Sequence, residues 1–89
     1  MLSLDECIAL SDLTADEIAV IADHERVPEI VAAGLGHHLL QSRKGLFQLR
    51  SMIAEMLARA KLAGARDESK RLDGVLRRFN SVHPVPRVL

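Results

Sequence analysis

Histidine and carboxylate side chains between residues 24 and 38 are the groups of this sequence best suited to binding a metal ion. His24, Glu25 and Glu29 flank Pro28, and His38 follows further along the chain. Imidazole nitrogens and carboxylate oxygens are common metal ligands. His24 and Glu25 begin like the zinc-protease motif H-E-x-x-H, but Pro28 occupies the place of the second histidine. His24, Glu25, Glu29 and His38 are therefore weak candidate metal ligands that match no diagnostic spacing.

Other metal-binding patterns fit no better. A di-iron bundle needs a histidine three positions after a glutamate, and neither Glu25 nor Glu29 is followed by one. His37 and His38 are adjacent, so on a helix they point about 100° apart and do not face one ion. Glu25 continues the apolar face of its helix, which leaves two interpretations. It forms a salt bridge with an arginine of the second half of the chain, or it binds a ligand or partner.

Catalytic motifs are missing from the sequence. Cys7 is the sole cysteine, and its neighbours Asp5 and Glu6 raise the pKa of a thiol rather than activate it. Neither a nucleophile elbow, nor a P-loop, nor a dinucleotide-binding motif occurs. We expect no enzyme and no cofactor. A single cysteine forms no internal disulfide, and the first residues carry acids where a secretory signal carries bases, so we expect a cytoplasmic protein.

The charged residues are divided unequally between the two halves of the chain. Residues 1–42 hold eight acids and one base, whereas residues 43–89 hold eleven bases and four acids. Three interpretations follow: the halves neutralise each other within one molecule, they meet across a homodimer, or the basic half binds nucleic acid. The candidate partner or nucleic-acid surface consists of basic residues near the chain's C-terminal end: Arg59, Lys61, Arg66, Lys70, Arg71, Arg77 and Arg78.

Helical periodicity runs through almost the whole of the 89-residue chain. Ser3 with Glu6, and Thr14 with Glu17, form capping-box patterns that mark helix starts. Pro28 suits a first helical turn, and the residue before it avoids the helical conformation. The helices that we expect cover residues 4–10, 15–26, 28–41, 45–63 and 67–82. The expected apolar faces are Ile18, Ile21 and Ala22 in the second helix, Val31, Ala32, Leu35 and Leu39 in the third, Leu46, Leu49, Met52, Ile53, Met56, Leu57 and Ala60 in the fourth, and Leu72, Val75, Leu76, Phe79 and Val82 in the fifth. The opposite, polar face of the fourth helix consists of Gln48, Ser51, Glu55 and Arg59.

The predicted fold class is all-α: a small bundle of four to five helices with short turns, one domain over residues 1–82, and an extended tail over residues 83–89. The chain is 48% apolar but only 2% aromatic, so its core is built from small aliphatic side chains. No apolar run reaches the ~20 residues of a membrane span. A core this light favours dimerisation, which buries further apolar surface. Met52 and Met56 are expected in this core rather than at a partner surface.

Residues 21–36, IADHERVPEIVAAGLG, resemble segments of small all-helical bacterial proteins. The resemblance implies no particular activity and points to the junction from His24 to Glu29 as the distinctive part of the chain. The light core, the division of charge and the lack of catalytic motifs predict a small cytosolic protein that acts by protein–protein association, as a homodimer. The alternatives are nucleic-acid binding through the last two helices and metal binding at residues 24–29. No membrane partner is expected.

Overall fold

A computed structural model describes residues 13–84, and this part of the chain contains four α-helices and no strand. In chain order they are α2 (Ala15–Glu25), α3 (Glu29–Leu39), α4 (Arg43–Leu62) and α5 (Arg66–Val82). The predicted all-α class is confirmed. The expected helix over residues 4–10 and residues 85–89 of the expected tail lie outside the described residues. None of the helices within residues 13–84 is long and apolar enough to cross a membrane.

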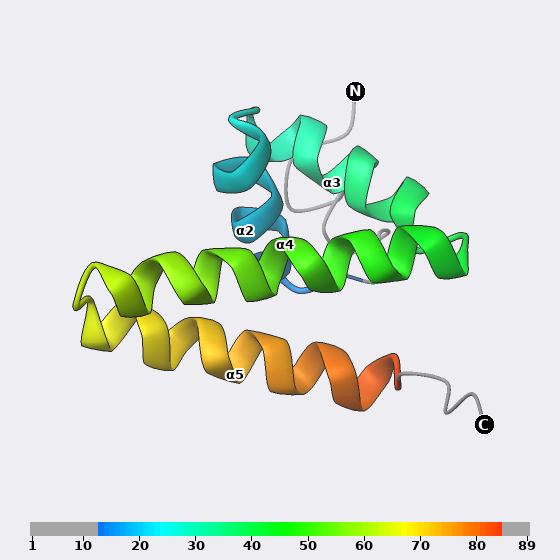
Figure 1. The fold of residues 1–89 in the computed structure, drawn as a ribbon. Helices are drawn as coiled ribbons and strands as arrows, with labels where there is room; N and C mark the ends of the chain where they lie inside the picture. The colour runs from blue at the N-terminus through cyan, green and yellow to red at the C-terminus, as the bar shows by residue number, and fades with distance from the viewer. Residues whose placement is uncertain (1–12, 85–89) are drawn as a thin grey trace.

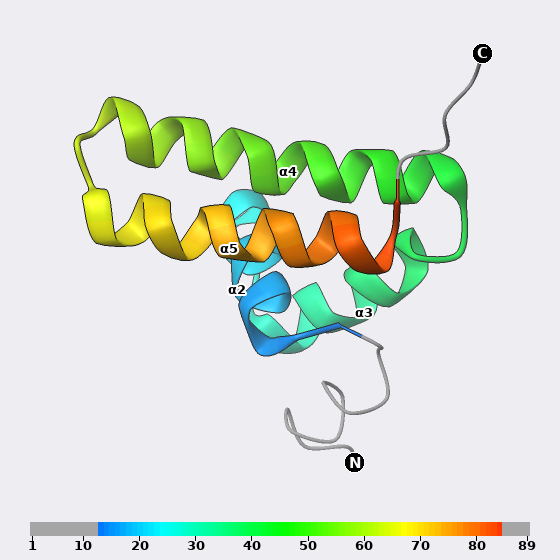
Figure 2. The same cartoon turned by 90° about the horizontal axis from the view of Figure 1, so that it is seen from below.

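The four helices form two layers (Figures 1 and 2). α4 and α5 run antiparallel as a long hairpin, and the shorter helices α2 and α3 pack together on one side of it. α4 is the central helix, because it contacts α2, α3 and α5. One long face of α4 nevertheless points away from the other three helices (Figure 2).

The start of α2 is fixed by the capping box that the sequence predicts. The Glu17 amide donates a hydrogen bond to the Thr14 hydroxyl (3.1 Å), and the Thr14 amide donates one to the Glu17 carboxylate (2.9 Å). α2 ends where Arg26 adopts the left-handed conformation, with a φ of 56°. Pro28 then stands at the N-cap of α3. The predicted break between these two helices is confirmed to within a residue.

α4 begins two residues earlier than predicted. The Ser42 hydroxyl accepts a hydrogen bond from the Gly45 amide at 2.9 Å and so caps the helix, which makes residues 43 and 44 helical rather than part of a loop. Gly45 packs directly against the end of α3. A Cβ at this position would overlap the Leu39 carbonyl oxygen and lie 2.7 Å from the Leu39 carbonyl carbon. The tight corner between α3 and α4 therefore requires glycine at residue 45.

The core lies where the two layers meet. Its largest fully buried side chains come from α2, α4 and α5: Ile18, Val20, Ile21, Leu49, Ile53, Leu72 and Phe79. These residues lie on the apolar stripes that the sequence predicts for the three helices, except that Val20 was not assigned to one. Met52 and Met56 lie partly buried against this cluster, as expected.

α3 buries most of the face predicted for it, since Ala32 and Leu39 are buried and Leu35 is partly buried, with Val31 as the exception. Val31, expected in the core, is 50% exposed, whereas Ala32 and Gly36 are buried. Because these residues are small, α3 lies close to α2: a Cβ at Gly36 would lie 2.8 Å from the side chain of Ile21. At the end of α5, Val82 was also expected in the core and is 62% exposed.

Candidate functional site

A groove of about 470 Å³ lies between α2, α3 and α4. Its apolar part is formed by Leu35, Leu39, Phe47 and Met52. Its polar end is formed by His24, Glu25 and Glu55. The groove therefore combines an apolar surface with a cluster of titratable groups. Two of these groups, His24 and Glu25 on α2, were candidate metal ligands in the sequence.

His24 lies between two carboxylates at the polar end of this groove. Its Nδ1 is 3.0 Å from Glu25 Oε2, and its Nε2 is 2.9 Å from Glu55 Oε2 on α4. Since both ring nitrogens face carboxylate oxygens, this arrangement favours the doubly protonated imidazolium, which donates at both nitrogens. Glu55 also accepts a hydrogen bond of 2.7 Å from Arg59. The four side chains form a row of alternating charges across the contact between α2 and α4.

The carboxylates raise the pKa of His24 above its ordinary value of 6.5, mainly through the hydrogen bond to Glu55 and against the effect of burial. The same hydrogen bond lowers the pKa of Glu55 below 4.5, and the charge of Arg59 acts in the same direction. A group whose pKa rises on folding stabilises the fold at pH values below its pKa in the unfolded chain. A group whose pKa falls on folding stabilises the fold at pH values above its pKa in the unfolded chain. The pair of His24 and Glu55 therefore makes its full contribution to stability between pH 4.5 and 6.5, which are the ordinary pKa values of glutamate and histidine. Its contribution is lost as the pH rises through the folded pKa of His24 or falls through that of Glu55.

The structure does not bring the four candidate metal ligands together. His24 and Glu25 share the groove, but the exposed side chains of Glu29 and His38 have no hydrogen bond or ion pair with them. Within residues 13–84 no group of three or more His, Cys, Asp or Glu is placed to hold a metal ion. Of the two interpretations of Glu25, the salt bridge with an arginine is not found within residues 13–84, where Glu25 pairs with His24 of its own helix. Sequence reasoning also missed Glu55, which lies 31 residues from its histidine partner.

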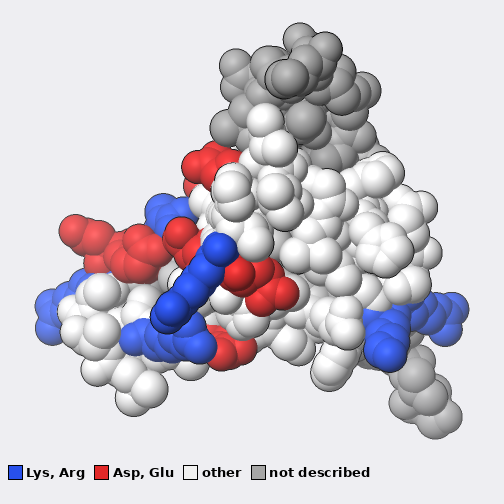
Figure 3. Space-filling view, turned by 90° about the horizontal axis from the view of Figure 1, so that it is seen from above, with Lys and Arg blue, Asp and Glu red and all other residues white. Residues whose placement is uncertain are grey.

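The seven basic residues predicted as a partner or nucleic-acid surface fall into two groups. Three are ion-paired: Arg59 with Glu55 (2.7 Å), Arg71 with Glu68 (2.5 Å) and Asp16 (3.4 Å), and Arg77 with Asp73 (3.0 Å). Four have no ion pair with any described residue: Lys61, Arg66, Lys70 and Arg78. Figure 3 shows acids and bases side by side at one end of the molecule and a broad uncharged area over α3.

Within residues 13–84, two ion pairs join the first half of the chain to the second. Between Asp16 and Arg71 runs the single ion pair of residues 13–84 that joins an acid of the first half to a lysine or arginine of the second. The other ion pair between the halves, His24 with Glu55, has the opposite polarity.

A second hollow, of about 280 Å³, lies between the start of α2 and the middle of α5, and we refer to it as the α2–α5 cleft. α2 contributes Thr14 and Asp16, and α5 contributes Lys70, Arg71, Gly74, Val75 and Arg78. Three of the predicted basic residues thus meet in one hollow. Of these three, Arg71 is held by carboxylates, whereas Lys70 and Arg78 are not.

α4 carries a row of uncharged side chains on its outward face. This outer stripe of α4 consists of Phe47, Ser51, Ala54, Ala58 and Leu62, all of them exposed. Steps of four, three, four and four residues keep the five side chains within about 80° of the helix circumference. Phe47 is 67% and Leu62 is 89% exposed, the highest values among the large apolar side chains of residues 13–84.

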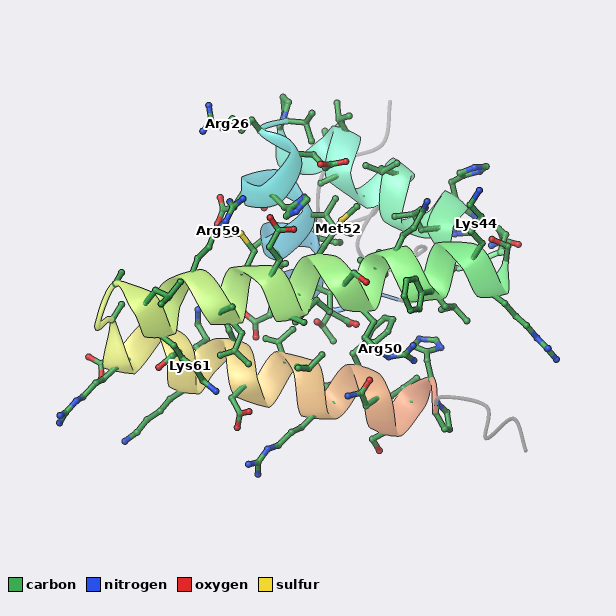
Figure 4. All side chains as sticks on the ribbon, in the orientation of Figure 1. Arg26, Lys44, Arg50, Met52, Arg59 and Lys61 are labelled. Atoms are coloured by element: carbon green, nitrogen blue, oxygen red, sulfur yellow. The ribbon has the colours of Figure 1, made fainter. Side chains whose placement is uncertain are left out.

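Figure 4 labels side chains of α4 that lie on either side of the outer stripe. Met52 and Arg59 lie on the side of α4 that faces α2 and α3, and Arg50 and Lys61 lie on the side that faces α5. By helical periodicity the outer stripe lies between these two rows, and two of its members, Phe47 and Ser51, also line the groove. Sequence reasoning missed it, because it described the outward face of this helix as polar and gave no place to Phe47.

No family model, curated protein or solved structure matches this chain. The resemblance of residues 21–36 to bacterial helical proteins therefore gains no support from these comparisons. The groove, the α2–α5 cleft and the outer stripe are the observations that bear on function.

Proposed function

We propose that this protein acts by self-association, with the outer stripe of α4 as the contact between two copies. The observation that carries the proposal is the joint exposure of Phe47 and Leu62 on one face of one helix. They are 15 residues apart, or about 22 Å along the helix axis. Exposed apolar side chains that lie together mark interaction surfaces more strongly than isolated ones. The small residues between them allow a second helix to approach closely.

The order of side-chain sizes along the stripe suits a partner that presents the same stripe. In a parallel two-fold pair, each residue faces its own counterpart. Phe47 then packs on Phe47 of the second copy, and Leu62 packs on Leu62. Between them, Ser51, Ala54 and Ala58 meet their counterparts and leave room for close contact. A second copy necessarily presents the same order of large and small residues, so the two stripes match. An unrelated helix would fit only if it had the same spacing of large and small residues.

Charge favours a parallel over an antiparallel pair. α2 and α3 lie on one side of α4, and α5 lies on the other (Figure 1). Residues 13–42 hold five acids and one base, and residues 43–84 hold ten bases and four acids. A parallel pair places the acidic side of one copy opposite the basic side of the other, with Glu55 near Arg50 and Lys61 of the second copy. An antiparallel pair would instead place Arg50 close to Lys61, and bring the two acidic sides together.

The strength of such a pair follows from the side chains that it buries. Full burial of an exposed phenylalanine or leucine contributes about 2 kcal/mol, so two copies of Phe47 and of Leu62 contribute roughly 8 kcal/mol before the cost of association. A free energy of about 8 kcal/mol corresponds to a dissociation constant near 1 µM. We therefore expect a dimer no tighter than this, which dissociates on dilution and resists high salt.

The mass in solution tests the proposal. Light scattering after size exclusion, over a range of protein concentrations, should give a dimer for the wild type and a monomer for Phe47→Asp and Leu62→Asp. Ile30→Asp is the matched control, because Ile30 is 51% exposed on α3, away from the stripe. It should remain a dimer. A wild-type monomer at every concentration, or a dimer that persists in both stripe variants, would overturn the proposal.

Cysteine cross-linking tests the direction of the pair. In a Cys7→Ser background, Ala58→Cys should form a disulfide between two copies if the helices are parallel, because residue 58 then meets itself. In an antiparallel pair centred on the stripe, the two residues would lie about 10 Å apart along the axis, which is too far for a disulfide. Ala54→Cys, at the middle of the stripe, should cross-link in either direction and serves as the positive control.

A further inference from the structure

We propose that the α2–α5 cleft binds a phosphate dianion. Lys70 and Arg78 line this cleft, and neither has an ion pair with any described residue. They are eight residues apart on α5, so their backbones are about 12 Å apart along the helix axis. Both side chains are long enough to reach toward a point between them. This surface is separate from the outer stripe of α4, so the inference does not depend on self-association.

Gly74 lies midway between the two cations and forms part of the cleft. A Cβ at this position would meet nothing within 4 Å, so packing gives no reason for a glycine here. Glycine inside a helix costs about 1 kcal/mol relative to alanine. Because Gly74 has no side chain, the backbone of α5 is accessible between Lys70 and Arg78, and a ligand can approach it there.

Arg71 forms the wall of the cleft beside these residues. Its guanidinium is 2.5 Å from a Glu68 oxygen and 3.4 Å from an Asp16 oxygen. The carboxylate of Asp16, which would repel an anion, is therefore engaged by Arg71. Lys70 and Arg78 also line the hollow, and no carboxylate of residues 13–84 forms an ion pair with either of them.

The charge and the size of the cleft select the ligand. Two cations match the two negative charges of a phosphate dianion, and an arginine guanidinium can bind two phosphate oxygens at once. The volume of about 280 Å³ has room for a tetrahedral anion together with several waters, each of which takes about 30 Å³. No aromatic side chain lines the cleft to stack on a base. These features favour a compact phosphate over an extended nucleic acid, which carries one charge per phosphate.

Calorimetric titration with inorganic phosphate at low ionic strength tests the inference. Wild-type protein should bind one phosphate per chain with saturation. The Lys70→Ala/Arg78→Ala variant should bind at least about tenfold more weakly, because two charge-assisted contacts are removed. The matched control is Lys61→Ala/Arg66→Ala, which removes one lysine and one arginine outside the cleft, again without ion pairs, and should bind like the wild type. Absence of saturation in the wild type, or equal losses in both variants, would overturn the proposal.

Two further measurements test where the phosphate binds and whether it is a free phosphate or part of a nucleic acid. Gly74→Ala should raise the melting temperature and weaken phosphate binding, whereas Gly34→Ala, also in open space, should raise the melting temperature alone. Unchanged phosphate binding in Gly74→Ala would refute the placement over Gly74. A labelled DNA duplex, followed by fluorescence anisotropy, provides the second arm. DNA binding that both double variants weaken equally, without saturation by inorganic phosphate, would replace the cleft with a diffuse basic surface.

Discussion

Replacing Gly45 with alanine tests the close contact that joins α3 to α4 and so shapes the groove beside α4. The added Cβ would overlap the carbonyl oxygen of Leu39, and would lie 2.7 Å from its carbonyl carbon and 2.8 Å from its Cα. Favourable contacts between carbon atoms begin at about 3.5 Å. The end of α3 and the start of α4 must therefore move apart, and both are backbone segments that cannot rotate away as a side chain can.

The size of the effect follows from two opposing terms. Overpacking a tight site costs about 1–3 kcal/mol and occasionally more, and a contact between backbone atoms belongs at the upper end. The higher helix propensity of alanine offsets about 1 kcal/mol of this cost. The free energy of unfolding of Gly45→Ala should therefore be lower than that of the wild type by about 2 kcal/mol. Gly34→Ala is the matched control, because a Cβ at Gly34 meets nothing within 4 Å. It should gain up to about 1 kcal/mol.

Urea unfolding and thermal melting, followed by circular dichroism, measure this difference directly. Gly45→Ala should be the least stable protein and Gly34→Ala the most stable, with the wild type between them. A difference of about 3 kcal/mol between the variants corresponds to roughly 12–24 °C in melting temperature for a chain of this size. If Gly45→Ala proved as stable as the wild type, the corner between α3 and α4 would not be tightly packed, and the reasoning would be refuted.

Three other changes have defined outcomes. Ile53→Ala should lower the unfolding free energy by about 2–5 kcal/mol in urea unfolding, because Ile53 is fully buried. Thr14→Ala should cost about 1 kcal/mol in the same assay through loss of the α2 cap. Glu55→Gln should lower the pKa of His24 toward 6.5 in an NMR titration. Its stability should differ from the wild type most between pH 4.5 and 6.5, and a difference that is constant with pH would contradict the proposed pair.

The helices could be predicted from the sequence because the signals that start and stop them are local. The capping box of Thr14 and Glu17 acts within a single turn, and the break before Pro28 depends on neighbouring residues alone. The start of α4 was predicted two residues late, since the Ser42 cap was assigned to a loop. Most of the inward face of α3 was predicted, and Val31 was misplaced for a different reason. Hydrophobic periodicity selects large residues such as Val31, whereas close packing against α2 selects small ones.

The candidate surfaces could be predicted only in part, because they depend on contacts between distant residues. Nothing in the sequence relates His24 to Glu55, which meet only once α2 packs on α4. The basic residues near the end of the chain can be named from the sequence, but their separation into ion-paired and unpaired members depends on the tertiary fold. The outer stripe was missed because the outward face of α4 was predicted to be polar, and only the structure shows that Phe47 and Leu62 are exposed there.

The arrangement of α4 and α5 allows this small chain to carry two independent surfaces. α4 uses its inner sides to contact three helices, which leaves the outer stripe free of the intramolecular core. α5 packs chiefly on α4, so the side of α5 that meets the start of α2 stays open enough to form the cleft. Disrupting one surface should therefore leave the other intact. Phe47→Asp should still bind inorganic phosphate, and Lys70→Ala/Arg78→Ala should still form a dimer. Loss of both properties in either variant would indicate damage to the shared fold rather than to a binding surface.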